Sequence, residues 1–237
     1  MSRIHAQAVE ANVAGYQHDE VAGYLGHAYH RRRLELAIGS LARHFAADRR
    51  VPLVADLGAN DGQVCTWLTG RGMRPIACDI VPHARRVAKE RGLLTVGLDA
   101  SRPLPFGTAS LDGILAGEII EHLYDPGLLL RECARVLRPG GIVVLTTPNL
   151  AGAQDRLRFL AGHSPRQVDP FHEYLSVHIR PFTYGMLATG LRLAGLTPSR
   201  PLSNYVVWRT RFGELSSGWA ARLWPTLGGS LVVAAVR

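Results

Sequence analysis

The sequence predicts an α/β protein built on one mostly parallel, seven-stranded sheet with helices on both faces. Three observations favour it: apolar segments alternate with helical patterns from residue 51 onward, glycine and proline turns separate them, and an acid follows each of the first three apolar segments. The 237 residues are 47% hydrophobic and 19% charged, which is ordinary for a globular protein with a well-buried core. We therefore expect a single domain over residues 1–237.

Residues 1–50 are expected to form a helical N-terminal cover over the strand ends. Leu34, Ile38, Leu41 and Phe45 recur at helical spacing. The segment lacks the alternating or continuous apolar pattern of a strand, so it lies outside the sheet.

Residues 51–149 contain most of the alternation. Pro82 stands at the start of a predicted helix, where the missing backbone N–H costs little. The expected strands are 51–57, 74–78, 93–98, 111–116 and 142–147, and the expected helices are 63–70, 82–91 and 126–137.

The alternation of strands and helices is interrupted over residues 150–182. This predicts a partly helical lid inserted after the fifth strand. The rest, residues 183–237, completes the sheet. Thr183 is the expected N-cap of a helix over 183–194. Residues 206–210 and 231–236 are the expected sixth and seventh strands.

A glycine turn follows the first strand, in the pattern Asp56-x-Gly58-x-x-x-Gly62. Ligands of open α/β sheets bind just beyond the carboxyl ends of the strands, and glycine lets a backbone approach them closely. The dinucleotide fingerprint G-x-G-x-x-G would need glycine where Asn60 and Gln63 stand. The pattern therefore indicates either a different nucleotide site or a plain structural turn.

Three acids, Asp56, Asp79 and Asp99, end three successive predicted strands. Parallel strands bring their carboxyl ends to one edge, so we expect these acids along one rim. Asp79 could accept hydrogen bonds from both hydroxyls of a ribose, Asp99 from an exocyclic amine, and Asp56 could face an ammonium group. The alternative for any one of them is a turn or N-cap residue.

The motifs quoted next resemble those of the class I S-adenosylmethionine-dependent methyltransferases. D-x-G-x-x-x-G is similar to their first motif, D/E-x-G-x-G-x-G, with Asn60 in place of the middle glycine. The later motifs resemble those of a subgroup that is similar to small-molecule O-methyltransferases. These motifs are G-E-I-I-E-H-L at 117–123, R-V-L-R-P-G-G at 135–141, T-T-P-N at 146–149 and H-I-R-P-F-T at 178–183. The whole resemblance covers about residues 51–196.

This resemblance implies a Rossmann-like fold, S-adenosyl-L-methionine as the cofactor, and residues 51–149 as the cofactor-binding half. It implies that the glycine turn lines the methionine part of the cofactor, while residues after the second and third strands hold the ribose and the adenine. The implied cofactor-binding residues are Asp56, Gly58, Asn60, Gly62, Asp79, Ile80, Asp99, Ala100 and Glu118.

Glu118, Glu121 and His122 have the i, i+3, i+4 spacing that places side chains on one face of a helical turn. One interpretation makes His122 a general base assisted by Glu121. Another makes Glu118, Glu121, His122 and His178 ligands of Mg²⁺, Mn²⁺ or Co²⁺, with His172 competing for the place of His178. A third is a structural helix cap. A similar E-x-x-E-H occurs in small-RNA 2′-O-methyltransferases and in ubiquinone-pathway O-methyltransferases.

The function that this resemblance implies first is O-methylation of a small-molecule hydroxyl on a sugar, a phenol or a natural product. The alternatives are N-methylation of a small molecule or peptide, RNA 2′-O-methylation, and a nucleotide-binding scaffold without enzymatic activity. An acceptor pocket is expected from residues 1–50 and 150–177, which match no motif.

The composition of the chain limits the kinds of binding partner that we expect. The net charge is +8, but only one of 27 basic residues is lysine, which indicates a coding bias more than a nucleic-acid surface. The triplet 31–33 is either a solvated face or a phosphate site. Residues 1–25 carry no continuous apolar segment, so we expect a cytoplasmic protein without a membrane partner. A homodimer is compatible with the sequence, and Cys65, Cys78 and Cys133 are expected to be buried thiols.

Overall fold

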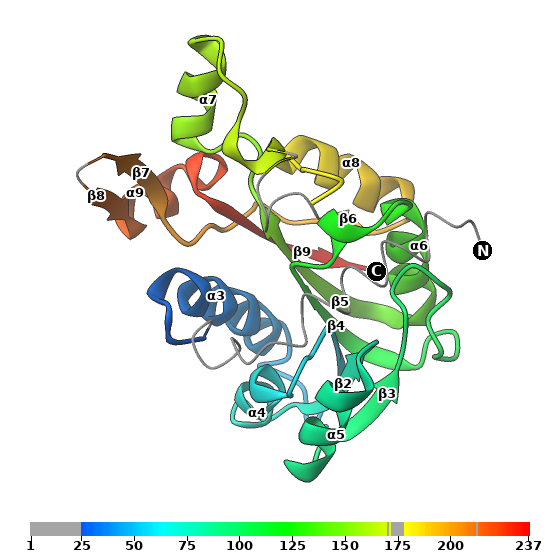
Figure 1. Ribbon diagram of the computed structural model, residues 1–237. Helices are drawn as coiled ribbons and strands as arrows, with labels where there is room; N and C mark the ends of the chain where they lie inside the picture. The colour runs from blue at the N-terminus through cyan, green and yellow to red at the C-terminus, as the bar shows by residue number, and fades with distance from the viewer. Residues whose placement is uncertain (1–24, 170, 172–177, 212) are drawn as a thin grey trace.

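The computed structural model describes residues 25–169, 171, 178–211 and 213–237. Its main sheet has seven strands in the order β3-β2-β1-β4-β5-β9-β6 (Figure 1). Strands β1 to β5 pair in parallel, and β9 runs antiparallel to both of its neighbours. The predicted fold class is confirmed. The strands are β1 Leu53–Leu57, β2 Arg74–Asp79, β3 Leu94–Gly97, β4 Leu111–Gly117, β5 Leu137–Pro148, β6 Thr197–Pro198 and β9 Ser230–Val236.

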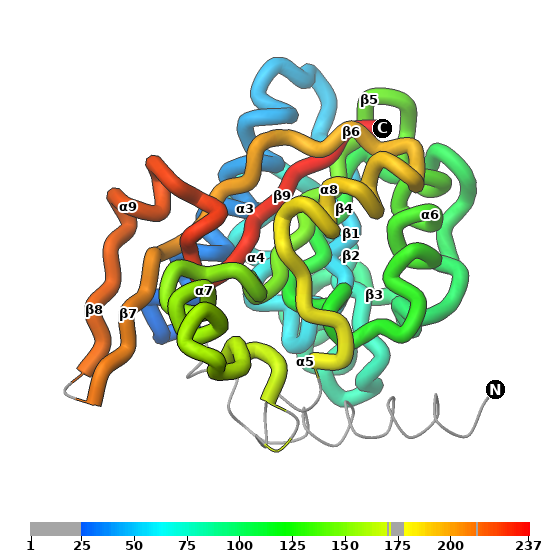
Figure 2. The backbone as a smooth tube through the Cα atoms, turned by 90° about the horizontal axis from the view of Figure 1, so that it is seen from above, coloured from blue at the N-terminus to red at the C-terminus, as the bar shows by residue number. Residues whose placement is uncertain are grey.

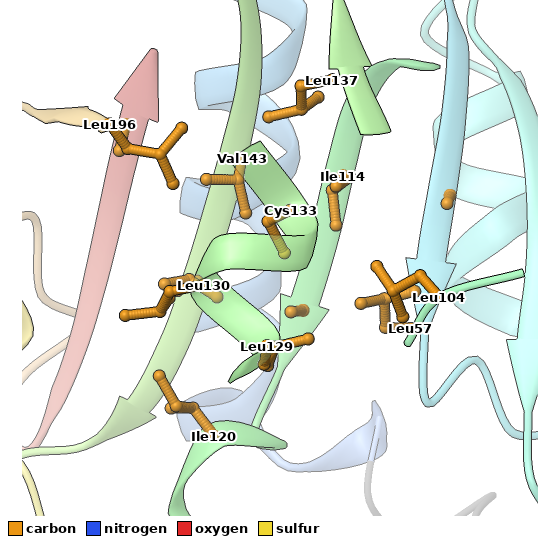
Figure 3. Packing of buried hydrophobic residues seen from close by; sticks show 14 of the residues in the cluster. Leu57, Leu104, Ile114, Ile120, Leu129, Leu130, Cys133, Leu137, Val143 and Leu196 are labelled. Atoms are coloured by element: carbon orange, nitrogen blue, oxygen red, sulfur yellow. The ribbon is translucent and has the colours of Figure 1, made fainter. Parts of the chain in front are cut away.

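Helices cover both faces of this sheet. On one face α3 and α4 pack on the central strands, and α5 packs beside them on β2. On the other face lie α6 and α8. Figure 3 shows Leu129, Leu130 and Cys133 of α6 near Ile114 of β4 and Val143 of β5. These helices are α3 Ala28–His44, α4 Gln63–Thr69, α5 Pro82–Glu90, α6 Pro126–Val136 and α8 Tyr184–Leu193.

The central strands are buried on both sides, which explains their nearly continuous apolar sequence. In β5, Val143 and Leu145 belong to the cluster under α6 and α8, whereas Ile142 and Val144 belong to the cluster under α3 and α4. The side chains of a strand alternate between faces, so this one run serves both cores. All three cysteines are buried free thiols, as expected.

The expected sixth strand was assigned to the wrong sheet. Residues 206–210 do form a strand, β7 Val206–Thr210, but it pairs with β8 Gly213–Ser217 in a separate two-stranded sheet. The sixth strand of the main sheet is the two-residue β6, which follows α8 directly and pairs with β9. Of β7 only Val207 is buried, so this segment lacks the apolar face that a place in the main sheet would require.

The insertion after β5 contains α7 Ala153–Leu160 and the short 3₁₀ helix η2 Arg166–Val168. Gln154 of α7 exchanges hydrogen bonds with the backbone of Arg209, which attaches α7 to β7. Figure 2 shows the β7–β8 hairpin projecting on the opposite side of the molecule from α6. After the hairpin, α9 Gly218–Leu223 and η4 Pro225–Leu227 lead into β9. Whether the insertion acts as a lid stays a prediction.

The helices α4, α5, α6 and α8 begin and end within two residues of the ranges expected for them. Thr183 caps α8, as expected, by accepting a hydrogen bond from the backbone N–H of Met186 at 3.3 Å. The helix expected from the spacing of Leu34, Ile38, Leu41 and Phe45 is present as α3. The remainder of the expected N-terminal cover, residues 1–24, lies outside the described residues. Within the described part of the chain, no helix combines the length and the apolar character needed to cross a membrane.

Candidate active site at the carboxyl edge of the sheet

The turn between β1 and α4 has a left-handed backbone at three positions. Gly58, Asn60 and Gly62 have φ values of 73°, 48° and 81°. A Cβ at Gly58 would meet the end of the Ile119 side chain, and a Cβ at Gly62 would meet the end of the Leu93 side chain. These side chains can move, so the positive φ is the main reason for glycine at both positions. Asn60 stands where the motif has glycine, and asparagine tolerates positive φ better than most residues. The departure from the motif therefore preserves the shape of the turn.

Asp79 ends β2 and holds this turn against the next loop. One carboxylate oxygen accepts from the backbone N–H of Asn60 and the other from that of Val81, both at 2.8 Å. The side chain remains partly exposed at the rim. Its implied contact with a ribose stays a prediction, and the structure adds a second role in organising the loops that would surround it.

The other two acids differ in position. Asp99 follows β3 and accepts a hydrogen bond from the backbone N–H of Ser101 at 2.9 Å, so it also stabilises its own turn. Asp56 lies one residue inside the end of β1, where it pairs in register with Ala77, two residues before Asp79. It is 4% exposed, and burial raises its pKa to about 7 while the Cys65 thiol donates to it at 3.4 Å. Asp56 therefore lies at the carboxyl end of β1, as expected, but it is buried, and its implied contact with an ammonium group stays a prediction.

The hydrogen-bond acceptors and apolar surfaces at the rim fit an adenosine-containing cofactor. Carboxylate oxygens of Asp79 and Asp99 can accept hydrogen bonds from hydroxyl and amine groups, and the glycine turn lies between β1 and α4 beside them. Ile80 and Ala100 follow the two acids and are half-buried, so each offers some apolar surface of the kind that a base can lie against.

Glu118 follows β4 and does not lie on a helical face with Glu121 and His122. Its φ is 54°, its backbone N–H donates to the carbonyl of Thr146 at 2.9 Å, and the 3₁₀ helix η1 Ile120–His122 begins only two residues later. Its carboxylate forms an ion pair with Arg33. The predicted i, i+3, i+4 grouping was wrong at Glu118, because the chain leaves the strand through a left-handed residue before the helical turn starts.

Arg33 lies at this site, although the sequence did not single it out from its triplet. The triplet 31–33 was interpreted as a unit, yet Arg31 and Arg32 lie near Glu35 on the exposed side of α3, whereas Arg33 is 2% exposed. Its guanidinium also donates to the Thr146 hydroxyl at 3.2 Å. Its spacing of four and eight residues from the buried Ala37 and Leu41 places it on the buried face of α3 and was the available signal. Arg33 thus ties the N-terminal helix to the ends of β4 and β5.

Glu121, His122 and His178 converge at this edge. Each offers a ligand atom, and these atoms all lie within 4.8 Å of one another. The imidazole rings of His122 and His178 are 4.9 Å apart, edge to face. The backbone N–H of Arg180 donates to the carbonyl of Glu121 at 3.0 Å, which joins η1 to the segment before α8. The competing residue, His172, lies outside the described residues.

The electrostatics of this cluster favour a cation or a proton donor. Burial raises the pKa of Glu121 to about 7, although the charge of Arg33 and the hydroxyl of Thr147 lower it. Burial and the neighbouring His122 lower the pKa of His178 to about 4, so this imidazole is neutral at pH 7. Although the Thr147 hydroxyl lies close by, neither carboxylate oxygen of Glu121 makes a hydrogen bond of normal geometry among the residues that the structure describes.

A narrow pocket, too tight in this structure to admit a water molecule, adjoins the cluster. Two of its polar residues, Thr147 and Gln167, were not singled out in the sequence, although Thr147 belongs to the T-T-P-N motif. The motif's last residue, Asn149, is structural: its amide donates to the carbonyls of Thr226 and Gly228 at 3.0 and 2.7 Å. The pocket is lined by Glu121, Thr147, Pro148, Gln167, His178 and Pro181.

Comparisons with known proteins agree with this geometry. Residues 55–145 match the family described as "Methyltransferase domain". The "Ubiquinone biosynthesis O-methyltransferase" of Xylella fastidiosa strain 9a5c is 31% identical over 181 residues, which cover 69% of this chain and 70% of that protein.

Two solved structures have a similar fold. One is 1,6-didemethyltoxoflavin-N1-methyltransferase of Burkholderia thailandensis with bound 1,6-didemethyltoxoflavin and S-adenosylhomocysteine; its TM-score is 0.67 at 20% identity, covering 100% of this chain and 90% of that one. The other is a methyltransferase of Haloferax volcanii in complex with the activator Trm112; its TM-score is 0.63 at 18% identity, covering 100% of this chain and 98% of that one. At these identities the likeness concerns the fold alone.

Proposed function

Because this chain belongs to the class I S-adenosylmethionine-dependent methyltransferases, we propose that it methylates a hydroxyl oxygen of a small molecule. The observation that carries the proposal is the convergence of three side chains at the carboxyl edge of the sheet. Glu121 and His122 come from the segment that follows β4, and His178 comes from the segment before α8. A relative named as an O-methyltransferase supports the choice of oxygen as the methylated atom.

The cofactor would be held by the turn after β1 and by the acids after β2 and β3. When bound, S-adenosyl-L-methionine supplies a methyl group activated by a sulfonium. Asp79 is proposed to accept from the ribose hydroxyls while it keeps Asn60 and Val81 in place. Asp99 and Ala100 are proposed to contact the adenine, and Ile80 to lie beside it. The backbone of Glu118 is proposed to border the methionine part of the cofactor. It is held in place by its hydrogen bond to the carbonyl of Thr146 and by the ion pair of its side chain with Arg33.

His122 is proposed to remove the proton that the acceptor hydroxyl loses as its oxygen is methylated. An imidazole has an ordinary pKa near 6.5, which suits proton removal at neutral pH. Glu121 and His178 are proposed to orient this imidazole, because both lie within reach of it.

As an alternative to general-base catalysis by His122, we propose that a divalent ion assists the reaction and takes His122 as a ligand. Glu121, His122 and His178 offer a carboxylate and two imidazoles, a donor set that suits Mn²⁺ and, less well, Mg²⁺. The unpartnered oxygens of Glu121 support this, since an ion there would compensate the buried charge and make a bound hydroxyl more acidic. Glu118 is left out of this ligand set because its carboxylate pairs with Arg33.

The test compares turnover with cofactor binding. In His122→Ala, turnover of labelled cofactor with hydroxyl acceptors should fall about 100-fold or more, the usual contribution of a general base. Affinity for S-adenosylhomocysteine should stay within about twofold. Equal losses in both would assign His122 a structural role. Full activity in EDTA would remove the ion from the proposal, and methylation of amines alone would replace O-methylation by N-methylation.

A further inference from the structure

We propose that Thr147 and Gln167 form an acceptor subsite beside the Glu121–His122–His178 cluster. This subsite binds a hydrogen-bond donor that the acceptor carries next to the group being methylated. The inference rests on the proposed function and deepens it by assigning residues that select the acceptor.

Unpartnered oxygens gather in this pocket. Thr147 is fully buried, and its hydroxyl lies close enough to the Glu121 carboxylate to lower the pKa of that group. Neither this hydroxyl oxygen nor the side-chain oxygen of Gln167 makes a hydrogen bond of normal geometry within the described part of the chain. Both oxygens of Glu121 share this property. Buried polar atoms are paired in the great majority of cases, so four unpaired oxygens around one pocket indicate a ligand that would pair them.

Two separate elements bring the subsite residues together, and each is anchored. Thr147 lies near the end of β5, where it pairs in register with Leu231 of β9. Gln167 lies in η2, and the neighbouring Arg166 donates from its backbone to the buried carboxylate of Asp155 in α7 at 3.0 Å. The Arg166 guanidinium also forms an ion pair with Asp155 at 3.3 Å. The fold therefore sets the position of Gln167, although it belongs to the inserted segment.

The chemistry of the pocket selects donors. A side-chain amide oxygen and carboxylate oxygens only accept hydrogen bonds, and a threonine hydroxyl can accept one while it donates another. The apolar walls come from Pro148 and Pro181. A neutral hydroxyl or an amine N–H on the acceptor would satisfy Gln167 and Thr147 while the adjacent group faces His122.

The experiment measures binding directly, by calorimetry on the chelator-treated protein saturated with S-adenosylhomocysteine. The probes are matched pairs: a catechol with the corresponding phenol, and a pyranoside with its monodeoxy analogue. The wild type should bind the vicinal diol of at least one pair about tenfold more tightly. Gln167→Leu and Thr147→Val should each remove most of this preference, while Thr147→Ser, which keeps the hydroxyl, should retain it.

Gln154→Leu is the matched control, because Gln154 lies in the same insertion but contacts β7. It should leave the preference unchanged. Equal binding within every pair, or the same preference in Gln167→Leu as in the wild type, would overturn the subsite. A preference that needs added Mn²⁺ and ignores Gln167→Leu would assign these oxygens to an ion and also overturn it.

Failure of the subsite is distinguishable from failure of the proposed function. If single hydroxyls are methylated as efficiently as diols, and the variants keep the same kcat/KM, O-methylation stands and the subsite falls. If S-adenosylhomocysteine does not bind to the protein, the proposed function is refuted, and the subsite that rests on it is refuted as well.

Discussion

Replacing Glu121 by Gln tests whether an uncompensated carboxylate lies at the centre of the site. Glu121 is 1% exposed, and burial raises its pKa from 4.5 to about 7. The folded protein therefore holds this proton more tightly than the unfolded chain does. The associated stability is fully present below pH 4.5 and is lost as the pH rises through 7.

The magnitude follows from the difference in proton affinity. Each tenfold change in proton affinity is worth about 1.4 kcal/mol, so the shift from 4.5 to about 7 corresponds to roughly 3 kcal/mol. Glutamine has nearly the same shape and does not ionise. Glu121→Gln should therefore unfold with the same free energy as the wild type at pH 4 and with up to about 3 kcal/mol more at pH 8.

The assay is urea unfolding at both pH values in the presence of a chelator. Both proteins retain His178, whose lowered pKa affects stability at acid pH, so its contribution cancels to first order in the comparison. Glu214→Gln is the control, because Glu214 lies on β8 with an exposed Arg209 as its partner, and it should change stability by less than about 0.5 kcal/mol. An equal effect of Glu121→Gln at pH 4 and pH 8, or a loss of stability at pH 8, would refute the reasoning.

Three further outcomes are expected. Asp79→Asn should weaken S-adenosylhomocysteine binding about tenfold or more by calorimetry, since it removes a charged acceptor; unchanged affinity would refute the ribose assignment. Arg33→Met should destabilise the fold by about 3 kcal/mol in denaturant, because it leaves the carboxylate of Glu118 largely buried without its partner, and adding Glu118→Gln should recover part of the loss; no recovery would contradict the pairing. Asn60→Ala should cost about 1 kcal/mol because φ is 48°, whereas Asn60→Gly should cost less, and the reverse order in thermal unfolding would contradict this account.

The local sequence pattern was enough to predict those parts of the structure that depend on residues close together in the chain. The order of strands and helices from β1 to α6 followed from apolar periodicity, and the glycine turn followed from the residues that tolerate positive φ. The positions of Asp79 and Asp99 followed from the ends of their strands. His122 and His178 were chosen from motif spacing, and the fold does bring them together with Glu121.

The amino-acid sequence alone thus determined the α/β class, the turn at the strand edge and the family. Only the tertiary structure decided that Arg33 reaches Glu118, that residues 197–198 rather than 206–210 complete the main sheet, and that Thr147 and Gln167 face one pocket. The physical reason is range: a turn or a helix is encoded by residues within a few positions, whereas a buried ion pair or a sheet edge depends on how distant segments compete for the same surface.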